Sequence, residues 1–139
     1  KDILYLILDE LTYHFKEPER GSVLIFKYPN DPSKYFIKRI IGLPGETVRI
    51  DGDSVLITTT DGKEISLTEP YIKNPGNGGF LEKELGADEY FVLGDNRRES
   101  SDSRFWGELP RENIVGRAFL RLLPLKHIDI FPGAASLQQ

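Results

Sequence analysis

Short runs of β-branched and aromatic residues recur along the chain, and clusters of turn-forming Gly, Pro, Asn and Asp residues separate them. Such side chains favour strands, and many short strands at regular spacing are typical of a sandwich or barrel. We predict an all-β fold whose antiparallel sheets form a compact sandwich or partly open barrel. No long amphipathic helix is indicated, although PREN (110–113) could begin one short turn. The predicted strands are residues 3–8, 22–28, 34–42, 46–51, 53–58, 89–94 and 114–123.

The chain length of 139 residues fits one domain with its own core. Residues 58–87 are the most polar and glycine-rich part of the chain. We predict that they form a small β-ribbon or flap, inserted into a β core made of residues 1–57 and 88–125. Residues 126–139 are expected to form a C-terminal tail.

Charge and composition argue against several classes of function. The net charge of −4 disfavours a nucleic-acid partner, because proteins that bind the phosphate backbone are normally basic. The chain has no Cys, and its two His residues, His14 and His127, are far apart in sequence. We therefore predict no metal site, no cofactor and no Ser-His-Asp triad. No apolar run is long enough to cross a bilayer, and because the chain starts with Lys1 we expect it to be a trimmed part of a longer protein.

Lys38 occupies an unusual place for a charged residue. It lies in FIKRIIG, an apolar run that lacks clean alternation and so indicates burial on both faces of the strand. A free lysine has a pKa of about 10.4, and burial among apolar neighbours lowers it by up to ~3–5. A neutral lysine amine can activate a serine hydroxyl without any histidine. The alternative is that Lys38 and Arg39 are simply exposed charges on a strand.

The stretch GDNRRESSDSR is a dense polar cluster that directly follows the apolar run EYFVL. An Asp and an Arg two residues apart on an extended chain share one face and could form a rigid bidentate pair. Asp and Asn side chains can tie a loop to its own backbone, and a serine could exchange a hydrogen bond with a lysine amine. The alternative is a surface turn that satisfies its own polar groups. The residues considered for a site are Asp95, Asn96, Ser100, Asp102 and Arg104.

Several segments, in order, resemble the conserved boxes of bacterial type I signal peptidases. GDNRRESSDSRFWG (94–107) resembles the family's C-terminal signature, and KRIIGLPGE (38–46) resembles its lysine box. The resemblance extends to ERGSVLIFKYP (19–29), LTEPYI (67–72) and PRENIVGRA (110–118), and so covers nearly the whole chain.

The resemblance implies an all-β catalytic domain, tethered to the cell membrane by an upstream transmembrane segment and facing the extracytoplasmic side. It implies Ser-Lys cleavage of signal peptides from secreted preproteins. Small residues such as Ala would be selected three before and immediately before the cut. By this resemblance Lys38 is the general base, and Ser100 positions it. Asp102 and Arg104 form a supporting pair, with Arg39 near them. Asp95 and Asn96 open the signature. Phe36 and Ile37 lie on the strand whose backbone pairs with the substrate.

One departure from the family pattern concerns the nucleophile. The family's Ser-Met-x-Pro-Thr box precedes the pattern resembled by DILYLILDELTY (2–13), which places the nucleophilic Ser before Lys1. We expect the chain as given to lack that serine. Two alternatives remain open: a non-catalytic relative that binds signal peptides, and a self-cleaving regulatory domain of the SOS-repressor type. The expected partners are signal peptides and, through the upstream anchor, membrane lipid; oligomeric state is left open.

Overall fold

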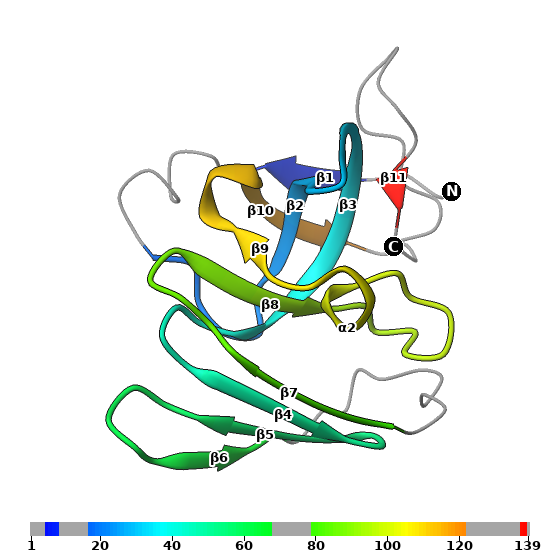
Figure 1. Ribbon diagram of the computed structural model, residues 1–139. Helices are drawn as coiled ribbons and strands as arrows, with labels where there is room; N and C mark the ends of the chain where they lie inside the picture. The colour runs from blue at the N-terminus through cyan, green and yellow to red at the C-terminus, as the bar shows by residue number, and fades with distance from the viewer. Residues whose placement is uncertain (1–4, 9–16, 68–78, 122–136, 139) are drawn as a thin grey trace.

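The computed structural model describes residues 5–8, 17–67, 79–121 and 137–138, which form two sheets. The larger sheet has the strand order β1-β10-β2-β3-β8-β9, with β11 also paired to β3, and the smaller has the order β6-β5-β4-β7 (Figure 1). Pairing among the described strands is antiparallel except between β11 and β3. The predicted all-β fold of antiparallel sheets is confirmed.

The elements have the following bounds. The larger sheet contains β1 (Tyr5–Leu8), β2 (Val23–Tyr28), β3 (Asp31–Gly42), β8 (Glu89–Leu93), β9 (Leu109–Pro110), β10 (Ile114–Arg121) and β11 (Leu137–Gln138). The smaller sheet contains β4 (Thr47–Asp51), β5 (Ser54–Thr58), β6 (Glu64–Ser66) and β7 (Phe80–Glu84). Two short helices are α2 (Ser103–Trp106) and the 3₁₀ turn η1 (Arg111–Asn113). Within the described residues no helix has the length and apolar character needed to cross a membrane.

Strand β3 is central to the larger sheet and is buried on both faces over its second half. Neighbouring residues on it belong to different cores: Ile40 packs with Phe26 and Tyr90, whereas Ile41 packs with Val48 and Phe91 between the two sheets. The alternating faces of a strand point to opposite sides, so this arrangement buries successive side chains. The prediction of two-sided burial for FIKRIIG is confirmed.

The boundary between the sheets differs from the boundary predicted for the inserted ribbon. The smaller sheet begins at Thr47, because β4 pairs with β5 and β7, and β5 pairs with β6. The sequence instead predicts a core that extends to residue 57. The alternation of β4 and β5 shows that one face is buried, but it does not say in which sheet the strands lie. The division into core and insert stays a prediction, and residues 68–78 lie outside the described part.

The strands that were not predicted individually have weak patterns. All residues of β6 (EIS) are exposed, and β7 (FLEKE) alternates between exposed and half-buried residues without a fully buried face. β9 and β11 have only two residues each. Their positions are set by partners that are distant in sequence.

Gly42 joins the two sheets at the end of β3. A Cβ atom there would lie 2.5 Å from Val48 Cγ2 and 2.9 Å from Leu85 Cδ1. We expect Gly42→Ala to lower the free energy of unfolding by about 1–3 kcal/mol, through overpacking. Urea denaturation of a double-mutant cycle with Val48→Ala checks the cause. Val48→Ala should cost less stability in the Gly42→Ala background than in the wild type; an equal cost would contradict this account.

Candidate active site

Lys38 is buried in the interior of the larger sheet and meets the polar cluster there. Its side chain is 1% exposed, so the alternative of an exposed strand charge is wrong. Its Nζ donates a hydrogen bond of 3.0 Å to Ser100 Oγ and lies 5.5 Å from the centre of the Phe36 ring. The structure thus brings together a lysine and a serine that are 62 residues apart in the chain.

Burial lowers the pKa of Lys38 from 10.5 to about 8, because an ammonium loses its hydration inside the protein. The negative charges of Asp102 and Asp95 act in the opposite direction, and the positive charge of Arg104 adds to the lowering. About half of the lysine side chains are therefore neutral near pH 8. A neutral amine at this position can accept a proton from a hydroxyl group.

Asp102 is the anchor of the polar cluster and is fully buried. Its carboxylate accepts hydrogen bonds from Arg104 Nε (2.8 Å), Arg104 Nη2 (2.9 Å) and the backbone N–H of Gly94 (3.0 Å). It also caps α2 by accepting from the backbone N–H of Arg104. These bonds fix both ends of residues 94–102, which we call the signature loop, and so hold Ser100 in place.

A second ion pair ties β3 to the start of the signature loop. Arg39 binds Asp95 with two parallel hydrogen bonds, of 3.0 Å from Nε and 2.8 Å from Nη2, and also donates to the carbonyl of Gly21. Bidentate pairs of this kind fix orientation as well as distance. The neighbouring Asn96 is half-buried, and its carbonyl accepts from the backbone N–H of Glu99, which closes a turn. The predicted residues therefore gather around Lys38, while their roles stay predictions.

Three residues of the site were not predicted. A Cβ on Gly94 would lie 1.9 Å from Ser100 Oγ and 3.4 Å from Lys38 Nζ, so only glycine permits this contact. Arg97 is buried and donates to the carbonyl of Gly94 at 2.8 Å. Ser103 Oγ accepts from the backbone N–H of Val92 at 2.9 Å. The position of Gly94 between a buried strand and a polar cluster was the available signal.

The edge of β3 beside the site is only partly occupied. β2 pairs with one edge, and β8 pairs with the other from Arg39 onward. Ahead of β8 on that second edge, β11 pairs with Tyr35 and Phe36 in the parallel direction. No described strand covers Ile37 or Lys38 there. The described residues hold no group of three or more His, Asp or Glu side chains that could bind a metal ion.

Comparison with known proteins gives a consistent picture. The family model described as "Signal peptidase, peptidase S26" matches residues 1–123. The chain is 43% identical over 131 residues to a signal peptidase I of Leptolyngbya laminosa, covering 88% of the chain and 62% of that relative. It is 40% identical to a probable signal peptidase I-2 of Synechocystis, and the match covers 90% of this chain and 57% of that relative. The crystal structure of a signal peptidase I from Enterococcus faecalis superposes with a TM-score of 0.61 at 32% identity, over 73% of this chain and 97% of that one.

The burial of Lys38 makes stability depend on pH. Between about pH 8 and 10.5 the unfolded chain keeps a proton that folded Lys38 has lost, so the stability of the wild type rises with pH in this window. Lys38→Met removes this contribution. We expect the stability of Lys38→Met relative to the wild type to fall by about 2–3 kcal/mol between pH 7 and pH 10, measured by urea denaturation.

The matched control is Lys27→Met, which removes an exposed lysine from the neighbouring strand β2. Its effect on stability gives the reference for replacing a strand lysine whose side chain stays exposed to water. A Lys38→Met difference that stays constant over the same pH range would show that the lysine is not desolvated.

Proposed function

The chain belongs to the signal peptidase family of peptidase S26, and on this basis we propose that it is most of the catalytic domain of an endopeptidase that removes signal peptides from secreted preproteins. The observation that carries the proposal is the buried hydrogen bond between Lys38 Nζ and Ser100 Oγ. The donor of this bond, the amine of Lys38, is desolvated, and its pKa of about 8 is low enough for a general base.

The proposed reaction is acyl transfer through a serine ester. Neutral Lys38 takes the proton from a serine hydroxyl, and the serine oxygen forms a bond to the scissile carbonyl carbon. The resulting ammonium gives its proton to the leaving amine nitrogen as the C–N bond breaks. Water then attacks the ester carbon and gives a proton to Lys38, and Lys38 returns this proton to the serine oxygen as the ester C–O bond breaks and the carboxylic acid is released. We propose that the nucleophilic serine belongs to the segment that precedes Lys1 in the longer protein.

The supporting residues have positioning roles in this proposal. Ser100 holds the amine of Lys38, and the pair of Asp102 with Arg104 holds the loop that carries Ser100. Arg39 and Asp95 fasten the same loop to β3, and Asn96 shapes its first turn. A catalytic group needs such support, because small errors in its position slow the reaction strongly.

The substrate is proposed to bind as an added strand along β3, through the backbone of Phe36 and Ile37. The support is the edge itself, which accepts β11 at Tyr35 and Phe36 and is covered by no strand of the described residues at Ile37. The proposed site of action is the cell membrane, with the domain on the extracytoplasmic side and a membrane anchor upstream. Signal peptides and membrane lipid are then the partners.

The two neighbouring serines of the signature loop provide a test in the longer protein. Ser100 is buried beside Lys38, whereas Ser101 is exposed. We expect Ser100→Ala to lower kcat/KM for a preprotein by up to about a hundredfold, and Ser101→Ala to change it less than about twofold. In the wild type, kcat/KM should rise with pH through about 8, as Lys38 loses its proton.

The pH profile separates positioning from folding. The pKa of Lys38 is set by its burial and by nearby charges, so Ser100→Ala should lower kcat/KM and leave the midpoint of the profile near pH 8, whereas partial unfolding would move the midpoint up. Lys38→Ala should abolish cleavage, while Lys27→Ala should not. Full activity of Lys38→Ala would overturn the proposal, and tight binding of signal peptides without any turnover would favour a non-catalytic relative.

A further inference from the structure

A pocket of about 330 Å³ is lined in part by Arg97 and Arg98 of the signature loop. The other lining residues come from the end of β4 and its turn into β5, from the start of β7, and from α2. Among the described residues that line the pocket, the charged groups are all guanidinium groups, and two phenylalanines are 67% and 74% exposed. The relevant residues are Phe80, Arg97, Arg98, Arg104 and Phe105.

The topology directs a bound peptide toward the signature loop, which lines this pocket. A strand that pairs with β3 in the parallel direction, as β11 does, runs from Tyr35 toward Lys38. It cannot continue along β3, because Arg39 is already paired with Leu93 of β8. The peptide must leave the sheet there, where β8 passes into Gly94 and the signature loop. The residues beyond Lys38 are those that follow the scissile bond.

The arginines of the pocket differ in how they are used. Arg97 donates to the carbonyl of Gly94, and Arg104 binds Asp102 through Nε and Nη2. Arg98 is exposed and has no ion pair or hydrogen bond within the described part of the chain. It is therefore the cation of the pocket that can pair with a ligand without breaking a bond inside the site.

We infer that this pocket binds the first residues after the scissile bond, and that Arg98 favours an acidic side chain among them, with Phe80 and Phe105 contacting the neighbouring apolar groups. The inference rests on the proposed function, because it takes the direction of the substrate from strand addition on β3. An extended peptide is the occupant, since the loop that lines the pocket begins at Gly94, beside Lys38, where such a peptide leaves the sheet edge. Complementary charge then provides selectivity.

The test is binding of fluorescein-labelled peptides to the chain, followed by fluorescence anisotropy. Each peptide carries an apolar segment with Ala three residues before and directly before the cut, followed by five residues. Asp or Lys replaces each of these five in turn. For at least one position we expect the Asp peptide to bind about three- to fivefold more tightly than the Lys peptide, with a smaller ratio at high salt.

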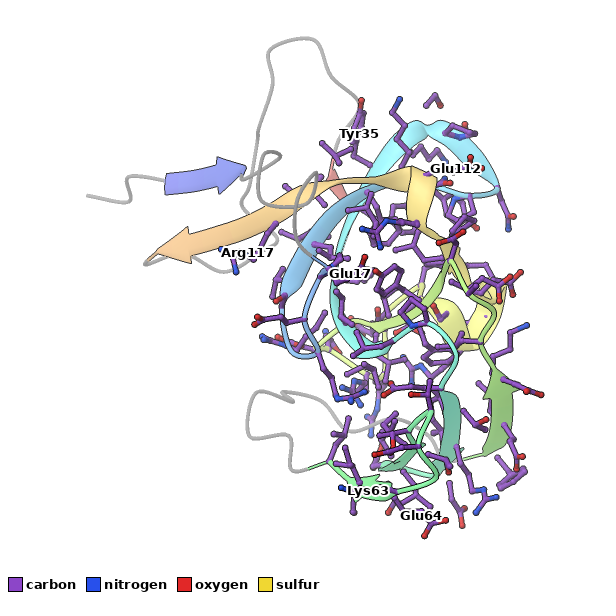
Figure 2. All side chains as sticks on the ribbon, turned by 90° about the vertical axis from the view of Figure 1, so that its left-hand side faces the viewer. Glu17, Tyr35, Lys63, Glu64, Glu112 and Arg117 are labelled. Atoms are coloured by element: carbon purple, nitrogen blue, oxygen red, sulfur yellow. The ribbon has the colours of Figure 1, made fainter. Side chains whose placement is uncertain are left out.

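Variants of Arg98 assign this preference to the pocket. Arg98→Glu should reverse the ratio between Asp and Lys peptides, and Arg98→Gln should bring it close to one. Lys63→Glu is the control with the same change of charge. Lys63 lies in the turn before β6, at the opposite end of β5 from Gly52, and Figure 2 shows it far from Tyr35. In the Lys63→Glu variant, the ratio between the affinities for Asp and Lys peptides should equal that of the wild type.

The outcomes separate the inference from the function on which it rests. If peptides bind but Asp and Lys peptides bind equally, or if Lys63→Glu changes the ratio as much as Arg98→Glu does, the pocket assignment is overturned while the proposed function stands. If no peptide of the series binds at millimolar concentration, either to this chain or to a variant that ends before Leu137 and so lacks β11, both the proposed function and the inference are overturned.

Discussion

A lysine amine held almost entirely out of water is the constraint on which the rest of the site depends. An ammonium ion buried without compensation would strongly oppose folding, and the protein reduces this penalty in two ways. The pKa of Lys38 falls to about 8, so that the neutral form is accessible. The negative charge of the buried Asp102 carboxylate stabilises the ammonium form. The same desolvation that lowers stability near neutral pH produces a base that can work there.

Holding that amine in one place requires the signature loop to be rigid. Asp102 fastens the loop at Gly94 and at α2, and Arg39 with Asp95 fastens its start to β3. Gly94 has a steric role as well, since a side chain there would occupy the place of Ser100 Oγ. Charge-assisted bonds of this kind are stronger than those between neutral groups. The polar density of the loop is thus explained by contacts inside the protein, together with a few groups that face the pocket.

Much of this could be predicted from local patterns. The strong strands were visible as apolar runs, and the unbroken run around Lys38 indicated burial on both faces. Local patterns did not say whether Lys38 was buried or exposed, and resemblance to a family supplied its expected partner Ser100. The sheet to which β4 and β5 belong, the pairing of β11, and the structural bonds of Arg97 and Ser103 depend on residues that meet only after folding. No local pattern contains that information.

The parallel pairing of β11 has a consequence for any ligand of this edge. Because β11 belongs to the same chain as β3, it competes for this edge within one molecule, and dilution does not weaken that competition. A peptide that binds along β3 as proposed would displace it at Tyr35 and Phe36, so the apparent Kd would exceed the intrinsic Kd by the reciprocal of the unoccupied fraction. This factor is common to all peptides. Absolute affinities therefore report the competition with β11, whereas ratios between peptides report the preferences of the site.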